Sequence, residues 1–278
     1  MNPTANHLVQ LQELILIRDE QKVTTGGEHL QEINKSIESM TAQLPRNVRD
    51  LFGRLLKRHH VAVVPVADGS CSACRMKLPI SQVQAVRSGK AIQACPSCAR
   101  LLYFPEGAAR SVGVRTRRMA PRKVGIARFS ASGLMAPRLA AKDAQEAITE
   151  LAEMMQTQGF VDKADRLIEE ALRRETVVST AVDHGLAFPH VRGVEGGGLT
   201  LALGLNPRGI HFDGAGTGLT RIVFFMVIPT AASAFYLKLL AGLTETFMKA
   251  DARKTLLANK DPEKLWKALV KLTRSTIK

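Results

Sequence analysis

The chain has 278 residues, a net charge of +14 and an ordinary apolar fraction of 45%. This length suffices for two domains with a sizeable core. No apolar run reaches the roughly 18 residues of a membrane span, and the longest one, 222–234, contains Pro229. The N-terminus lacks the basic and apolar regions of a signal peptide, so we expect a cytoplasmic protein without membrane insertion.

The positive charge is distributed unevenly along the chain. Residues 1–104 carry 13 basic and 8 acidic side chains, residues 105–128 carry 7 and 1, and residues 129–278 carry 19 and 16. The middle segment is therefore the most basic, and its cations are Arg110, Arg115, Arg117, Arg118, Arg122, Lys123 and Arg128. With glycines, a proline and few large apolar groups, this composition predicts a basic linker over 105–128.

Residues 1–60 are predicted to form a helical hairpin of the coiled-coil kind. After Gly26 and Gly27, apolar residues follow a heptad spacing at Leu30, Ile33, Ile37, Met40 and Leu44. Such a seam needs a partner helix, and Leu8, Leu11 and Ile15 provide a matching face upstream. The glycine pair predicts the turn, and a third amphipathic helix follows Pro45. A generic helical bundle is the alternative, and the seam would also permit a dimer.

All four cysteines belong to one pattern within residues 61–104. Cys71 and Cys74 form one CxxC knuckle, and Cys95 and Cys98 form a second one after twenty intervening residues. Two such knuckles suit one tetrahedral Zn²⁺, and a closed shell of four thiolates leaves no position for a catalytic water. We therefore expect one structural zinc per chain. A redox dithiol is the alternative, which the absence of a βαβ pattern disfavours.

The segments around the knuckles resemble a known family. They are Val-Val-Pro-Val at 63–66, Arg-Met-Lys-Leu-Pro at 75–79 and Arg-Leu-Leu-Tyr at 100–103. Together with the hairpin, they resemble bacterial proteins that join a coiled-coil hairpin to a C4-type zinc ribbon, over about residues 5–104. The resemblance implies binding of nucleic acid or of a partner protein.

Residues 129–278 show helical patterns interleaved with buried strands. The strands are expected at 199–205 and 222–228. Helices are expected after the caps Asp143 (a capping box with Glu146), Asp162 and Asp261, and Ser233 is expected to open another helix. We therefore predict a multidomain protein: a helical hairpin plus a small zinc ribbon, then an α/β domain with a mixed sheet flanked by helices.

The most informative site is a histidine that directly follows a proline, His190. To accept a phosphoryl group, an imidazole needs one unprotonated nitrogen, with the other held by a hydrogen bond. The pocket must also donate hydrogen bonds to three phosphoryl oxygens. Arg174, Ser179 and Thr180 supply such donors upstream. A Pro-His pair alone is weak, because a lone histidine is more often an ordinary core or surface residue.

A longer set of residues resembles the enzyme IIA domain of the mannitol/fructose type, which includes nitrogen-related regulatory members of the phosphoenolpyruvate-dependent phosphotransferase system. The matching residues are Arg174, Glu175, Ser179, Thr180, 185–190, Gly209, Ile210 and 237–241, and the resemblance spans about 129–274. It implies that His190 accepts phosphate from the carrier protein HPr and passes it to a IIB domain, with Arg174 as the pocket arginine.

One position departs from that family. The resemblance places a second histidine where this chain has Tyr236. A tyrosine hydroxyl can donate to a phosphoryl oxygen but titrates far above neutral pH and cannot become cationic. His184 and His211 do not match that position and are interpreted as ordinary surface or sheet residues.

Two functions follow from these patterns. The first is a phosphocarrier that passes phosphate to a IIB partner or uses it as a regulatory signal, and whether it is an enzyme depends on turnover at His190. The second is a zinc-ribbon regulator that binds nucleic acid or protein, with the IIA-like domain as a sensing or docking module. Few aromatic residues are available for stacking on bases, so nucleic-acid binding through the ribbon and basic linker would be electrostatic.

Overall fold

The computed structural model describes residues 3–24, 30–104, 124–194, 198–212 and 218–278. They belong to two compact units, one of residues 1–110 and 233–237, the other of 111–232 and 238–278. Most of the predicted basic linker, including Arg110, Arg115, Arg117, Arg118, Arg122 and Lys123, lies outside the described residues.

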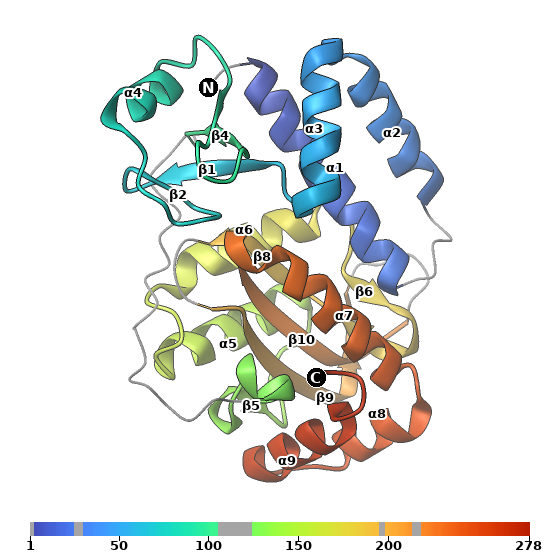
Figure 1. The fold of residues 1–278 in the computed structure, drawn as a ribbon. Helices are drawn as coiled ribbons and strands as arrows, with labels where there is room; N and C mark the ends of the chain where they lie inside the picture. Colours follow the sequence, from blue (N-terminus) through green and yellow to red (C-terminus); the bar gives the residue numbers. More distant parts are fainter. Residues whose placement is uncertain (1–2, 25–29, 105–123, 195–197, 213–217) are drawn as a thin grey trace. The chain divides into compact units, whose positions relative to one another are not determined.

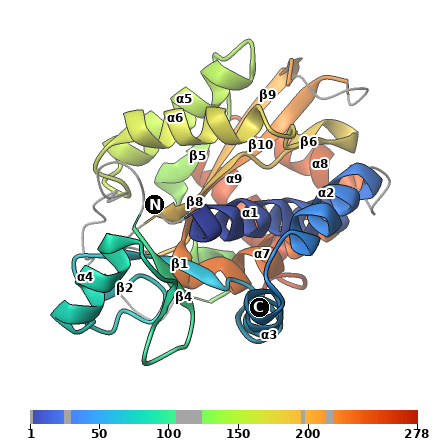
Figure 2. The ribbon, with the colours of Figure 1, turned by 90° about the horizontal axis from the view of Figure 1, so that it is seen from above.

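The first unit begins with three helices, α1 (Pro3–Thr24), α2 (Leu30–Ala42) and α3 (Arg46–His59). A hydrogen bond of 2.7 Å joins Nε2 of His7, near the start of α1, to the carbonyl of Met40, near the end of α2. The two helices are therefore antiparallel, as Figures 1 and 2 show. The heptad residues Ile37 and Leu44 are buried in the core that these helices form.

A small sheet follows the helices. Its strands are β1 (Val63–Ala67), β2 (Ser70–Cys71), β3 (Gln93–Ala94) and β4 (Leu101–Tyr103), in the order β2-β1-β4-β3, and α4 (Ile80–Ser88) lies between β2 and β3 in the chain. β1 pairs with β4 in parallel, and the two outer pairs are antiparallel. Cys71 is the last residue of β2, and Cys95 directly follows β3.

The hairpin and the ribbon share one hydrophobic core. Leu8 and Leu11 of α1 pack in the same cluster as Val63 of β1 and Leu101 of β4. The buried side chain of Gln12 adds polar contacts: its Oε1 accepts from the amides of Ala62 at 2.7 Å and Val63 at 2.8 Å, and its Nε2 donates to the Val63 carbonyl at 2.9 Å. The predicted boundary between residues 60 and 61 therefore falls inside one compact unit.

The second unit is an α/β domain with a mixed six-stranded sheet, as predicted. Its helices are α5 (Ala144–Thr157), α6 (Ala164–Glu175), α7 (Ser233–Phe247), α8 (Ala250–Leu257) and α9 (Pro262–Thr273). The first turn of α7 groups with the first unit. Short 3₁₀ turns are η1 (Gly125–Arg128), η2 (Ser132–Leu134), η3 (Asp183–Gly185) and η4 (Thr230–Ala232). Its strands are β5 (Met135–Ala136), β6 (Ala181–Val182), β7 (Leu186–Ala187), β8 (His190–Val194), β9 (Thr200–Ile210) and β10 (Thr220–Pro229).

Strand β10 is the centre of this sheet. It pairs with β9 in antiparallel fashion on one edge, and with β7 and β8 in parallel on the other. β7 and β8 are consecutive segments along that same edge, interrupted at Phe188 and Pro189. Figures 1 and 2 show α5 and α6 on one face of the sheet and α7 on the other.

The helix caps test the predicted helix starts. The Asp143 carboxylate accepts from the Glu146 amide at 2.8 Å, and that of Asp261 accepts from the Lys264 amide at 2.9 Å, so both caps are confirmed. The prediction for Asp162 was wrong, because the N-cap of α6 is Lys163, and the first amide of the helix, that of Ala164, donates to Oε1 of Gln156 at 3.0 Å instead.

The predicted linker also ends earlier than expected. Gly125–Arg128 form η1, and Ile126 is buried at 2% exposure. The reason is local packing: η1 contacts α9, and Arg128 donates to the carbonyl of Lys278. These residues therefore belong to the folded second unit. Among the described residues, none of the helices is long and apolar enough to span a bilayer.

Replacing Gln12 by Ala should destabilise the first unit, because two buried amides and one carbonyl lose their partner. We expect a loss on the order of 3 kcal/mol in the free energy of unfolding. Hydrogen exchange at the Ala62 and Val63 amides in the full chain measures it directly. Gln10→Ala, on the exposed face of α1, is the control, and equal protection in both variants would contradict the assignment.

Candidate functional site

The four cysteines of the first unit converge on one point. The sulfur atoms of Cys71, Cys74, Cys95 and Cys98 all lie within 4.8 Å of one another. The pairs Cys71–Cys98 and Cys74–Cys95 are 3.8 and 3.7 Å apart. Zn–S bonds of about 2.3 Å in a tetrahedron place the sulfurs about 3.8 Å apart. The donor set and its spacing therefore fit one Zn²⁺.

The two knuckles have the same backbone geometry. In the first, the amide of Arg75 donates to the Cys71 carbonyl at 2.7 Å, and in the second, that of Ala99 donates to the Cys95 carbonyl at 2.8 Å. Arg75 and Ala99 both adopt φ of 61°, the left-handed region that non-glycine residues rarely use. This conformation turns the chain tightly enough to direct both sulfurs of each knuckle inward.

The surroundings of the sulfurs set their protonation. Burial raises the pKa of the thiols of Cys71 and Cys74. At Cys98 burial acts in the same direction, but the amide and guanidinium of Arg100 lower the pKa to about 7. The guanidinium of Arg100 also donates to the Val61 carbonyl at 3.0 Å, which holds it at the cluster. Because metal binding displaces thiol protons, zinc retention should weaken as the pH falls.

In the second unit, His190 is the first residue of β8, and its side chain is 2% exposed. Its Nδ1 lies 3.0 Å from the carbonyl oxygen of Phe188. A carbonyl can only accept, so Nδ1 carries the proton, which in the neutral ring leaves the lone pair on Nε2. In this tautomer Nε2 is the ring nitrogen that can accept a hydrogen bond or act as a nucleophile.

Phe188 is itself fixed by the core. Its ring stacks on that of Phe224 in β10, with ring centroids 5.5 Å apart. The Phe224 ring in turn packs against that of Phe247 in α7, with ring centroids 5.1 Å apart. Its amide donates to the Thr180 carbonyl at 3.1 Å. The carbonyl that holds His190 therefore comes from a residue anchored through both its ring and its backbone.

Ser179 and Thr180, predicted as donors to phosphate, donate to another group in the structure. The Ser179 hydroxyl donates to Oε1 of Glu175 at 2.9 Å, and the Thr180 hydroxyl donates to Oε2 at 2.8 Å. The Thr180 amide also donates to Oε1, at 2.6 Å. To bind phosphoryl oxygens, the hydroxyls would have to leave Glu175. Sequence reasoning gave Glu175 no role, although a carboxylate four and five residues before a Ser-Thr pair is a readable signal.

Arg174 and Tyr236 lie on different helices. Arg174 is in the last turn of α6, and its guanidinium donates to the Val178 carbonyl at 2.8 Å. Tyr236 is in the first turn of α7 and is fully buried. Tyr236 groups with the first unit and His190 with the second, so their pairing stays a prediction. His184 is exposed, as expected, with a φ of 68°.

Comparison with known families identifies two segments. The model described as "Phosphoenolpyruvate-dependent sugar phosphotransferase system, EIIA 2" matches residues 132–271, which is half of the chain. The model of the C4-type zinc ribbon domain matches residues 70–102. Each segment contains the residues assembled above, His190 in the first and the four cysteines in the second.

Individual relatives match the second unit. A fructose-specific EIIA component of Haloferax volcanii is 29% identical over 40% of this chain and 72% of its own length. A nitrogen regulatory protein of Bradyrhizobium diazoefficiens is 29% identical over 48% of this chain and 86% of its own. Among solved structures, the nitrogen regulatory protein IIA-Ntr of Neisseria meningitidis is 19% identical, with a TM-score of 0.47, covering 52% of this chain and 98% of that one.

Chelation of the purified protein should release one zinc per chain and unfold the ribbon. Cys95→Ser should lower the zinc content and, because the ribbon shares a core with α1, also the stability of the hairpin. Metal analysis together with hydrogen exchange over residues 61–104 measures both effects. Ser97→Ala, an exposed change in the same knuckle, is the matched control. A metal-free wild-type protein with a protected ribbon would contradict the zinc assignment.

Proposed function

The chain belongs to the EIIA 2 family of the phosphoenolpyruvate-dependent sugar phosphotransferase system, and on that premise we propose that it is a histidyl phosphocarrier that uses His190. The observation that supports this role most directly is the 3.0 Å hydrogen bond from Nδ1 of His190 to the Phe188 carbonyl. That bond leaves Nε2 as the acceptor atom. It also fixes the plane of the ring before any partner arrives.

The proposed step needs few groups from the chain. The Nε2 lone pair attacks the phosphorus of a phosphohistidine on the carrier protein HPr. The P–N bond of the donor breaks, and its electron pair stays on the donor imidazole. The proton on Nδ1 stays in place, so the phosphorylated ring carries positive charge, which the Phe188 carbonyl stabilises. This contribution is positioning and electrostatics, as phosphoryl transfer requires.

The other predicted residues have supporting roles in this proposal. Arg174 would place one of its N–H groups on a phosphoryl oxygen while another holds the Val178 carbonyl. The Tyr236 hydroxyl would donate a hydrogen bond at the position where the family resemblance implies a second histidine. Onward transfer goes either to a IIB domain or to a regulatory target, and the attached zinc ribbon favours the regulatory version.

Incubation with phosphoenolpyruvate, enzyme I and HPr should add one acid-labile phosphoryl group to the protein, as measured by intact mass. His190→Ala should abolish the gain, because the attacking nitrogen is gone. His184→Asn, at an exposed neighbour whose left-handed backbone asparagine tolerates, should keep it. No gain in the wild type, or a gain that survives His190→Ala, refutes the phosphocarrier role.

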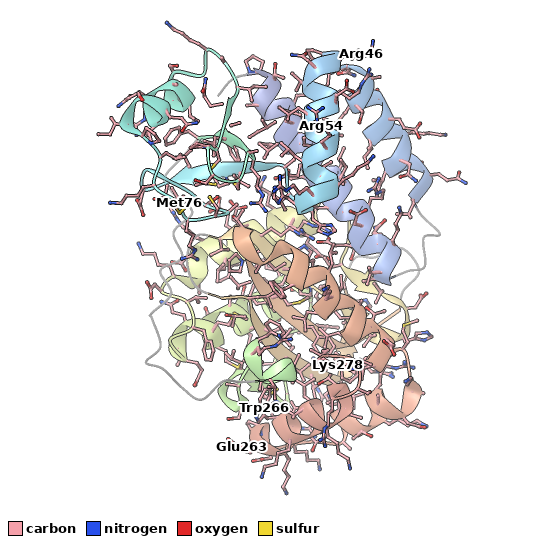
Figure 3. The ribbon with its side chains drawn as sticks, viewed as in Figure 1. Arg46, Arg54, Met76, Glu263, Trp266 and Lys278 are labelled. Atoms are coloured by element: carbon pink, nitrogen blue, oxygen red, sulfur yellow. The ribbon has the colours of Figure 1, made fainter. Side chains whose placement is uncertain are left out.

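A second function, binding of a nucleic-acid duplex, is favoured by α3. Its cations Arg46, Arg49, Arg54, Lys57 and Arg58 fall on one half of the helix surface, with Asp50 as the one acidic residue. Figure 3 shows Arg46 and Arg54 along this helix. None of the five forms an ion pair with a described residue. α3 also carries none of the exposed large apolar residues, so the face suits phosphates better than a membrane or an apolar protein surface.

Salt titration of duplex binding tests this second function. Replacing Arg46, Arg54 and Lys57 by Gln should reduce the slope of log K against log salt by about 2.7, which corresponds to three lost phosphate contacts. The matched control replaces the exposed Lys264, Lys267 and Lys271 of α9 by Gln. The same reduction in both triple variants, or no binding at low salt, removes the α3 assignment.

A further inference from the structure

Glu175 occupies an unfavourable position for a carboxylate. It is the last residue of α6, where the helix dipole presents its negative end. Its two oxygens nevertheless accept three hydrogen bonds, all from residues Ser179 and Thr180. Such bonds to a charged acceptor are about twice as strong as neutral ones. They hold the short segment 176–180 against the end of the helix.

A second set of contacts holds the same segment. The Arg174 guanidinium donates to the Val178 carbonyl at 2.8 Å, and the Val177 amide donates to the Arg174 carbonyl at 3.3 Å. The Ser179 hydroxyl oxygen accepts from the Ala181 amide at 3.2 Å. The backbone of Thr180 is therefore fixed where the chain enters β6.

From Thr180 a continuous series of hydrogen bonds leads to the imidazole. The Thr180 carbonyl accepts from the Phe188 amide at 3.1 Å, and the Phe188 carbonyl accepts from Nδ1 of His190 at 3.0 Å. The two bonds are linked through the backbone of Phe188, whose amide makes the first and whose carbonyl makes the second. A shift of Thr180 would thus move the Phe188 backbone and weaken the bond that selects the Nδ1–H tautomer.

We propose that Glu175 is a positioning residue for phosphoryl transfer, which holds Thr180 so that the Phe188 carbonyl keeps His190 in the Nδ1–H tautomer. This inference rests on the proposed phosphocarrier function for its kinetic consequence only. It also gives Ser179 and Thr180 a role other than phosphate binding: their hydroxyls orient the loop through Glu175. In this proposal Glu175 acts on His190 only through the hydrogen bonds that it accepts from Ser179 and Thr180.

The tautomer of His190 is the direct readout. In full-length protein labelled with ¹⁵N-histidine, the seven histidines give separate Nδ1 and Nε2 resonances, and the His190→Gln spectrum identifies those of His190. The wild type should show the Nδ1–H tautomer. Glu175→Ala should give a mixture of tautomers, and Glu175→Gln an intermediate one, because an amide nitrogen cannot accept from the Thr180 hydroxyl.

Kinetics supply the second readout. Glu175→Ala should lower kcat for phosphorylation on the order of 100-fold, the effect of misplacing a reacting group by about 1 Å. KM for the phosphorylated carrier should stay within about twofold, since both oxygens of Glu175 are bound by Ser179 and Thr180 rather than presented to a donor. Glu170→Gln is the matched control: it removes a carboxylate from the same helix, where Glu170 pairs with the exposed Arg173, and should change neither readout.

Two further variants keep the test decisive if Glu175→Ala does not fold. Thr180→Ser retains both the hydroxyl and the amide bond and should behave as wild type, whereas Thr180→Val loses the hydroxyl bond and should shift the tautomer ratio. Folded Glu175→Gln and Thr180→Val proteins that keep the wild-type tautomer would overturn the proposal. If the wild type itself is never phosphorylated, the phosphocarrier function fails, while the tautomer measurement still decides the role of Glu175.

Discussion

The pairing of β7 and β8 along one edge of β10 is the constraint on which the histidine site depends. Pro189 interrupts this edge and has no amide to donate, but its carbonyl accepts from the Met226 amide at 3.0 Å. The ladder therefore continues past the proline, and the Phe188 ring is stacked on Phe224 beneath it. Because backbone and ring are both held, the carbonyl beside His190 points in one direction before any partner binds. Catalysis of phosphoryl transfer depends mainly on such positioning of the reacting groups.

The zinc ribbon depends on a different constraint, the strained turn in each knuckle. Left-handed backbone at Arg75 and Ala99 costs roughly 1–2 kcal/mol per residue. A bound zinc, worth on the order of 10 kcal/mol in small domains, readily offsets that cost. Gln12 and Leu8 join α1 to β1 of the ribbon. Zinc binding at the knuckles should therefore stabilise the helical hairpin as well.

Sequence reasoning succeeded where a feature repeats or is local. The heptad at Ile37 and Leu44, the paired CxxC knuckles and the cap at Asp143 are all set by short-range spacing, and the structure contains each of them. It failed at Asp162, and it gave Glu175 no role. The role proposed for Glu175 depends on tertiary hydrogen bonds that connect it through Thr180 and Phe188 to His190. No periodicity encodes such a path, because it depends on which backbone groups the sheet brings together.

The charge distribution bears on how phosphorylation would be communicated within the chain. The phosphoryl group brings about −2 and the ring becomes cationic, so the net change is about −1, against +3 on residues 129–278, while residues 1–104 carry +5. At physiological salt the field of that group is screened over about 8 Å. A change of charge at the His190 imidazole therefore has little electrostatic effect on basic surfaces that lie farther away than this screening length. A regulatory signal from His190 must act through residues that touch the phosphorylated site, whether these belong to a partner or to the chain itself.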